Sequence, residues 1–94
     1  MPIVQFSETF KRALKALPTD RQQRIERAVL NFIADPHRPG LRFHKLQGLE
    51  VWSISSNRKD RVILEPVEGA DEETWLLLDV GAHDSAYRRL NRQK

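Results

Sequence analysis

An apolar run near the end of the chain constrains the fold most strongly. The residues from Trp75 to Val80 are apolar except for Asp79, and Gly81 follows directly. A short apolar run that ends at a glycine is typical of a buried strand, so the chain must build a sheet around it. His83 and Tyr87 come shortly afterwards. We therefore expect buried structure to give way to polar chemistry here, and we look for the functional site at this point.

Two helices are predicted in the first part of the chain. The first begins after Ser7, whose hydroxyl can cap it, and ends at Pro18. Thr19 and Gln22 have the spacing of a capping box, which predicts the start of the second helix. That helix ends at Asp35-Pro36. Apolar residues recur at helical spacing in both segments, so we expect an antiparallel helical hairpin whose apolar faces need a sheet to cover.

Short strands are predicted on both sides of the helical hairpin. Residues 2–6 form the first, and the later candidates are residues 41–46, 51–56, 61–67 and 74–80. The acidic segment 68–73 is predicted to be an exposed loop. Because the later connections are short, the sheet should be mostly antiparallel, which gives an α+β fold with both helices on one face. We expect a single domain over residues 1–94, a short helical tail at 84–91, and a binding surface on the open sheet face.

Charge is divided unevenly along the chain. Residues 1–64 carry a net charge of +6, residues 65–84 carry −7, and residues 85–94 carry +4. Such a chain can turn a basic face towards a polyanion, although a solvated surface of mixed charge fits these numbers equally well. There is no cysteine, and no apolar run approaches the ~20 residues of a membrane-spanning helix. We expect a soluble, cytoplasmic protein with no membrane partner.

Common catalytic motifs are absent from the sequence. It contains no phosphate-binding loop, zinc-protease motif or nucleophile elbow. The three histidines, His37, His44 and His83, are scattered through different segments, so we expect neither a metal site nor a cofactor. A metal-free site for a polyanion such as RNA remains possible. Cleavage of RNA at such a site needs a base, an acid and cations that stabilise the charge on phosphorus.

Several side chains suit those roles. His83 titrates near neutrality and could act as acid or base, and Tyr87 lies on the same side of a helical tail. Arg61 could hold phosphate through two parallel hydrogen bonds. The further candidate phosphate-binding residues are Arg42, Lys45, Arg58, Lys59 and Arg88.

These side chains also have structural explanations. Arg61 could pair with Asp79 or Glu65 across the sheet instead of binding a ligand. Tyr87 could fill the core with its ring, and polar residues at a hairpin tip are ordinarily solvated. Trp52 and Trp75 are more typical of a core than of a base-stacking surface.

The order of several segments resembles the RelE/ParE superfamily of bacterial toxins. The segments are Phe6–Phe10, Leu46–Gly48, Val51–Ser53, Asn57–Ile63 and Leu77–Arg88. The resemblance extends over nearly the whole chain. It implies a four-stranded antiparallel sheet with two N-terminal helices on one face, and a toxin that a cognate antitoxin neutralises. RelE-like members cut mRNA in the ribosomal A site, whereas ParE-like members inhibit DNA gyrase.

The resemblance also suggests roles for individual residues. Arg61 matches the arginine that opens the strand after the hairpin, His83 falls where the family has Arg or His, and Tyr87 resembles the C-terminal tyrosine of the RelE branch. That branch has lysines where this chain has Ser53 and Ser55. Our leading hypothesis is a type II toxin that cuts mRNA on the ribosome, with Arg61, His83 and Tyr87 as catalytic residues. The alternatives are a non-catalytic gyrase inhibitor and an inactive nucleic-acid-binding module.

Overall fold

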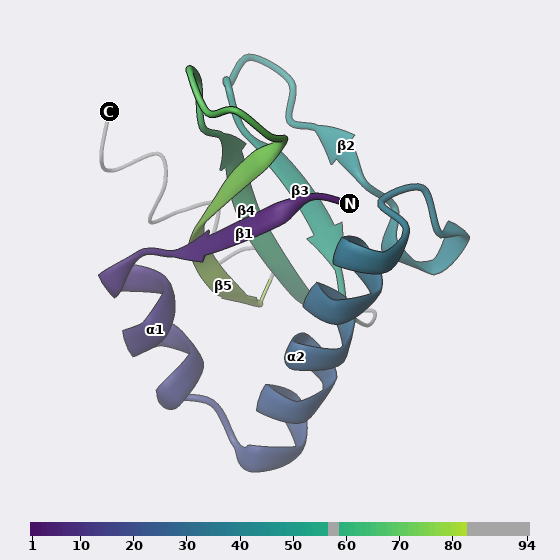
Figure 1. Cartoon of the computed structure of the whole chain (residues 1–94). Helices are drawn as coiled ribbons and strands as arrows, with labels where there is room; N and C mark the ends of the chain where they lie inside the picture. The colour runs from purple at the N-terminus through teal and green to yellow at the C-terminus, as the bar shows by residue number, and fades with distance from the viewer. Residues whose placement is uncertain (57–58, 83–94) are drawn as a thin grey trace.

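A computed structural model describes residues 1–56 and 59–82 of the chain. Figure 1 traces the path of the chain through its elements. In order, these are β1 (Ile3–Phe6), α1 (Glu8–Lys15), α2 (Thr19–Ala34), a 3-10 helix (Pro39–Leu41), β2 (His44–Lys45), β3 (Trp52–Ser55), β4 (Asp60–Pro66) and β5 (Thr74–Ala82). The predicted helical tail at 84–91 lies outside the described residues.

The sheet has five strands among the described residues, in the order β1-β5-β4-β3-β2. β1 runs parallel to β5, and the other neighbouring pairs are antiparallel. The sheet has five strands instead of the expected four, and it is not purely antiparallel as the resemblance implied. The α+β class and a mostly antiparallel sheet are confirmed. The helical hairpin carries the chain away after β1, and the last strand then enters the sheet beside β1 in the same direction.

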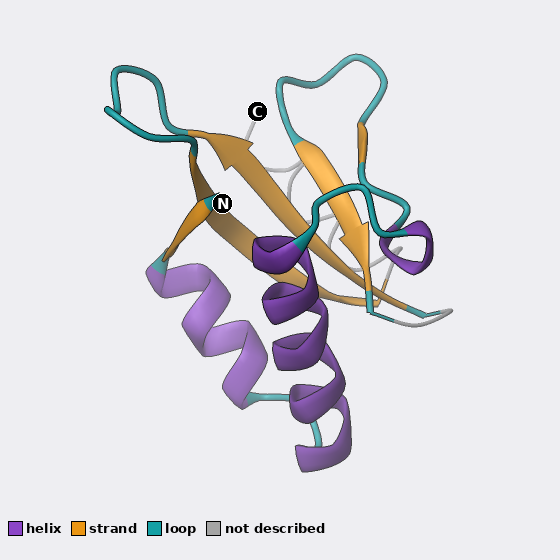
Figure 2. Cartoon of the chain, turned by 45° about the vertical axis from the view of Figure 1, so that its right-hand side comes forward, coloured by secondary structure: helices purple, strands orange, loops and turns teal. Residues whose placement is uncertain are grey.

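Both helices lie on one face of this sheet (Figures 1 and 2). The core between the helices and the sheet contains buried residues from α1, α2, the 3-10 helix, β3, β4 and β5. It includes Phe10 of α1, Ile25 and Phe32 of α2, and Leu64 and Leu77 of the sheet. The apolar periodicity that predicted the helices therefore identifies the residues that face the sheet.

Ser7 caps α1 as predicted. Its Oγ accepts a hydrogen bond from the Phe10 N–H at 3.0 Å. The same hydroxyl donates to the carbonyl oxygen of Leu78 in β5 at 2.9 Å. One side chain therefore starts the helix and attaches it to the central part of the sheet.

The predicted capping box of α2 is wrong. Pro18 occupies the N-cap position, and no side chain caps this helix. Thr19 is already the first helical residue, so its hydroxyl cannot act as the cap. Gln22 instead donates from Nε2 to the carbonyl oxygen of Leu17 at 2.8 Å.

The predicted strand at 41–46 is mostly replaced by irregular structure. Leu41 ends the 3-10 helix, and Arg42 adopts a left-handed conformation with φ of 51°. Leu41 is buried in the core, and Phe43 packs against it. The alternation of Leu41 and Phe43 therefore reflects core packing, and only His44–Lys45 pairs as a strand.

The opposite face of the sheet has an apolar end and a polar end. A small cluster of Leu46, Val51 and Ile63 fills the first, with Leu49 and Leu78 packed against it. The expectation of a face without any cover is thus corrected at this end, where the loop between β2 and β3 folds over the sheet. The polar end lies at the last residues of β3 and the first residues of β4, where Ser55 pairs with Arg61, and it carries the candidate site.

Candidate nucleic-acid interface

Arg61 lies on the open face at the start of β4. It is half-buried, and its register partners are Ser55 on β3 and Gly81 on β5. Its Nη1 donates to the carbonyl oxygen of Asp60 at 3.2 Å. Gly81 has φ of 155°, which L side chains rarely adopt, and it contributes no side chain opposite the arginine.

Buried serines line the neighbouring strand. Ser53 is 0% exposed and Ser55 is 7% exposed. Within residues 1–56 and 59–82, the hydroxyls of Ser53, Ser55 and Ser56 have no hydrogen-bond partner. Leaving a buried hydroxyl unpaired costs about 1–3 kcal/mol, so such groups need an explanation.

An ion pair that the sequence analysis missed holds this part of the sheet. Asp60 is 1% exposed, and its Oδ2 accepts from Arg21 Nε at 3.0 Å. Arg21 Nη2 donates to the other carboxylate oxygen, which makes the pair bidentate. The hydrogen bond to Asp60 raises the pKa of Arg21 above its ordinary value. The pair joins the start of α2 to the residue before Arg61.

The position of Arg21 in the sequence is the feature that could have predicted this ion pair. An arginine in the first turn of a helix is unfavourable for the helix dipole. Such a residue therefore indicates a carboxylate partner elsewhere in the fold. The sequence analysis left Asp60 between the strands predicted at 51–56 and 61–67 and so did not connect the two.

A second buried carboxylate lies on the same face as Arg61. Asp79 is opposite Ile63, and its Oδ1 accepts from the Val80 N–H at 2.8 Å. Its position is diagonal to Arg61 on the neighbouring strand, a relation that places Cα atoms ~7–8 Å apart. The register is therefore compatible with a pairing of Arg61 and Asp79, one of the alternatives from the sequence, which stays a prediction.

Lys45 is distant from Arg61. Lys45 pairs with Trp52, which lies three residues before Ser55 on β3, a distance of ~10 Å along the strand. β2 and β4 are also separated by β3, which adds ~10 Å across the sheet. Lys45 Nζ lies 5.5 Å from the centre of the Trp52 ring and 3.4 Å from Glu50 Oε2. Lys45 and Arg61 could therefore contact only different phosphates.

No family model and no curated protein matches this sequence. Solved structures do match. A metal-bound toxin from Helicobacter pylori is 21% identical with a TM-score of 0.70, covering 90% of this chain and 98% of that one. YafQ from E. coli is 11% identical with a TM-score of 0.70, covering 90% and 97%. This is the fold of the RelE-type toxins. RelE in an archaeal RelE–RelB complex from Pyrococcus horikoshii also shares it, at 18% identity, a TM-score of 0.66, and coverage of 85% and 92%.

The structure describes the positions of some of the predicted site residues. Arg61 lies on the open face, Lys59 is exposed beside it in the chain, and Arg42 is exposed before β2. His44 Nδ1 lies 2.6 Å from the carbonyl oxygen of Arg42, which holds that segment locally. The remaining candidates, Arg58, His83, Tyr87 and Arg88, lie outside the described residues, so their roles stay predictions.

The two tryptophans belong to the core of this RelE-type fold, as predicted. Their rings meet edge to face with centroids 5.2 Å apart. Trp75 is buried and its Nε1 donates to Glu73 Oε2 at 2.8 Å. Trp75 is thus enclosed in the core, and Trp52 is half-buried against it.

Residues 1–56 and 59–82 contain no group of three or more His, Cys, Asp or Glu side chains placed to hold a metal ion. No helix within these ranges is long and apolar enough to cross a membrane.

Proposed function

We propose that this chain is the toxin of a type II toxin–antitoxin pair and that it cleaves mRNA on the ribosome in the cytoplasm. The observation that carries the proposal is the RelE-type fold, matched over nearly the full length of the toxins compared. An arginine on the open face between Ser55 and Gly81 supports it. That face offers a positive charge beside unpaired hydroxyls.

The chemistry requires a transfer of protons around one phosphate. The 2′-hydroxyl of the RNA attacks the adjacent phosphorus, and the bond to the 5′-oxygen breaks. We assign the removal of the 2′ proton and the protonation of the 5′-oxygen to His83 and Tyr87. Arg61 stabilises the negative charge that develops on the phosphate oxygens. Arg42, Lys45, Arg58, Lys59 and Arg88 bind flanking phosphates.

The serines on β3 favour a second candidate function. Ser53 and Ser55 stand where the RelE branch has lysines, and both are buried. The strand therefore lacks two cations, and each such group is worth roughly a few kcal/mol when catalysis depends on it. This observation favours a gyrase inhibitor of the same fold, or an inactive module that only binds nucleic acid.

Induced expression in bacteria, with mapping of transcript 5′ ends, separates these functions. We expect the wild type to arrest growth and to produce codon-phased cuts. Arg61→Gln and His83→Ala/Tyr87→Phe should reduce the cuts by about a hundredfold or more. Arg12→Gln is the matched control, because Arg12 is an exposed residue of α1.

Each outcome of this experiment has a distinct meaning. Arrest with DNA damage signalling and no cuts would replace the ribonuclease with a gyrase inhibitor. The absence of arrest, with the protein expressed and folded, would leave the binding module. Cuts that persist in Arg61→Gln would remove Arg61 from the catalytic site.

A cognate antitoxin is the expected protein partner, since structures with this fold include complexes titled RelE–RelB. We place its acidic residues opposite Arg58 and Arg61, over an interface of ~800 Å² per partner. A second surface is available between α1 and α2. There a groove of about 450 Å³ is lined mainly by apolar side chains, and Phe6 and Leu30 beside it are 46% and 65% exposed.

A further inference from the structure

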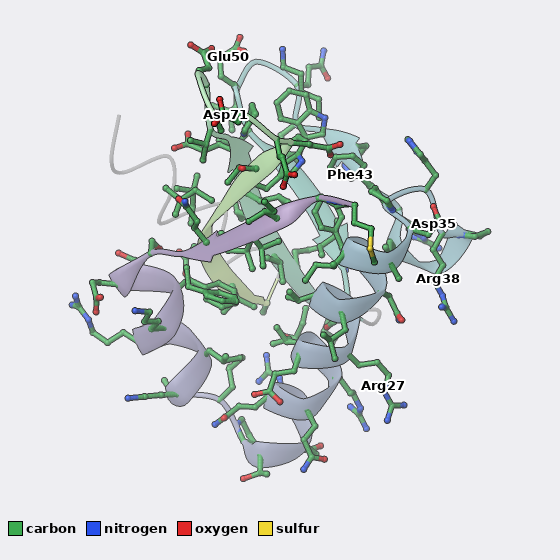
Figure 3. All side chains as sticks on the ribbon, viewed as in Figure 1. Arg27, Asp35, Arg38, Phe43, Glu50 and Asp71 are labelled. Atoms are coloured by element: carbon green, nitrogen blue, oxygen red, sulfur yellow. The ribbon has the colours of Figure 1, made fainter. Side chains whose placement is uncertain are left out.

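A basic cavity lies on the edge of the molecule away from β1. It has a volume of about 270 Å³ and is bordered by α2, the 3-10 helix and the end of β3. Its polar lining consists of Arg24, Arg27, Asn31, Arg38, Ser55 and Ser56. Figure 3 shows Arg27 and Arg38 projecting on the same side of the molecule. No carboxylate is among the described residues that line it, so the cavity suits an anion.

The arginines around this cavity are poorly neutralised. Arg24 Nη1 lies 4.0 Å from Asp20 Oδ2, and both side chains are exposed. Among the described residues, neither Arg27 nor Arg38 has a carboxylate oxygen within 4.0 Å. Arg38 Nη1 donates only weakly to Asn31 Oδ1, at 3.4 Å. Three like charges around one cavity repel each other unless an anion joins them.

The end of β3 adds further hydrogen-bonding groups. β2 pairs with β3 only at Trp52 and Ser53, so the edge of the sheet is open beyond them. The Ser56 N–H donates to the Asp60 carbonyl oxygen at 3.2 Å. By the alternation of an antiparallel ladder, the backbone N–H of Ser55 is directed away from β4, towards this open edge. The hydroxyls of Ser55 and Ser56 are among the unpaired groups described above.

We propose that this cavity binds a backbone phosphate of single-stranded RNA, as a second phosphate site beside the one at Arg61. RNA as the ligand rests on the proposed function. Ser55 lines the cavity and is also the register partner of Arg61, so the two sites meet at one residue of β3. The Arg61 side chain lies on the sheet face away from the helices, whereas the cavity borders α2, so an RNA strand that passes around the end of β3 contacts both sites. The guanidinium fork of the cavity arginines matches phosphate geometry.

The cavity is large enough for this ligand. A bound water takes ~30 Å³, so about 270 Å³ accommodates a phosphate together with part of its sugar or its hydration. The lining is charged on the α2 side, and the β3 side offers the backbone N–H of Ser55. Phosphate oxygens therefore have donors on both sides.

A charge-matched pair of double variants tests the proposal. Arg27→Gln/Arg38→Gln removes two positive charges at the cavity, and Arg12→Gln/Lys15→Gln removes two exposed charges on α1. The measurement is the dissociation constant for a fluorescent oligoribonucleotide of about ten nucleotides, between about 50 and 200 mM salt. We expect the cavity variant to bind about tenfold more weakly and to reduce the salt slope by ~0.7 for one lost phosphate. The α1 variant should lie within about twofold of the wild type. Equal losses in the two variants would overturn the proposal in favour of diffuse attraction.

A second measurement is independent of RNA cleavage. Titration of the labelled protein with inorganic phosphate should shift the backbone amide resonances of Gly40, Ser55 and Ser56, and Arg27→Gln/Arg38→Gln should abolish these shifts. Absence of shifts in the wild type would overturn the phosphate site even if cells show mRNA cuts. Shifts without cuts would instead keep the site and reject the ribonuclease. If the variant lost affinity for its antitoxin while RNA binding was unchanged, the cavity would be a protein-binding site and our proposal would be wrong.

Discussion

Asp60 and Arg21 show how one pair of residues positions the start of β4. Asp60 is buried whereas about a third of the Arg21 side chain is exposed, and the two form a bidentate ion pair between α2 and the sheet. The pKa of Arg21 is raised in the folded protein. Its contribution to stability is therefore complete below the ordinary pKa of arginine and is lost only as the pH rises through the raised pKa. At neutral pH Arg21 is therefore protonated and stays paired with Asp60.

Breaking this pair should destabilise the protein measurably. Removing one partner of a buried pair costs about 3–5 kcal/mol, and the partial exposure of Arg21 favours the lower end. We expect Arg21→Gln to lower the unfolding free energy by about 2–3 kcal/mol, and Arg21→Gln/Asp60→Asn to recover part of this loss. Urea unfolding measures both. Arg24→Gln, whose partner lies at 4.0 Å on the surface, should cost under about 0.5 kcal/mol. Equal losses for Arg21→Gln and Arg24→Gln would show that the buried pair contributes nothing.

At the scale of elements, α1 depends on its contacts with the sheet. It has eight residues, and an isolated helix of that length is marginal in water. Ser7 supplies both its cap and its hydrogen bond to β5. The short helix therefore gains much of its order from a single hydroxyl and from Phe10 in the core.

Ser7→Ala removes both hydrogen bonds of this hydroxyl. We expect a loss of about 1–2 kcal/mol in unfolding free energy, because the cap and the bond to Leu78 disappear together. Thr9→Ala is the control, since Thr9 is exposed in the same helix. Thermal unfolding followed by circular dichroism compares them. A midpoint for Ser7→Ala equal to that of Thr9→Ala would contradict a structural role for the cap.

Local patterns predicted the helices well and the sheet pairing poorly. The apolar stripes, Ser7 and the prolines define both helices, because these signals act within a few residues. The partner of β1 is about 70 residues away, and a strand pattern carries no information about its partner. The same limit applies to the site. The sequence placed Arg61 at the start of the strand after the hairpin, whereas the return of Arg38 towards Arg27 depends on the irregular segment after α2.

At the scale of the whole molecule, charge and apolar surface are separated. The acidic loop between β4 and β5 and the loop containing Glu50 lie at one end, as Figure 3 shows for Glu50 and Asp71. The basic cavity lies towards the other end of β3, and the apolar groove lies between the helices. Separate surfaces can therefore contact RNA and a protein partner.

The groove gives a test of the antitoxin proposal. Leu30 is largely exposed, so Leu30→Ser should leave stability within about 0.5 kcal/mol of the wild type. We expect it to weaken antitoxin binding by about tenfold or more, because a partner that fills the groove loses an apolar contact. Isothermal titration measures the affinity, with Arg12→Ser as the control on the exposed face of α1. Unchanged affinity would exclude the groove from the interface.

The central position of β5 has a consequence for how the protein is made. β5 is the last described strand to be synthesised, yet it lies between β1, which is made first, and β4. During synthesis, β1 and both helices are therefore made before β5, the strand that pairs with β1. Sheets built from segments far apart in the sequence also fold slowly. The sheet and the surface around Arg61 cannot form until β5 has left the ribosome. A ribosome-directed toxin with this strand order would thus be inert until its last described strand has emerged.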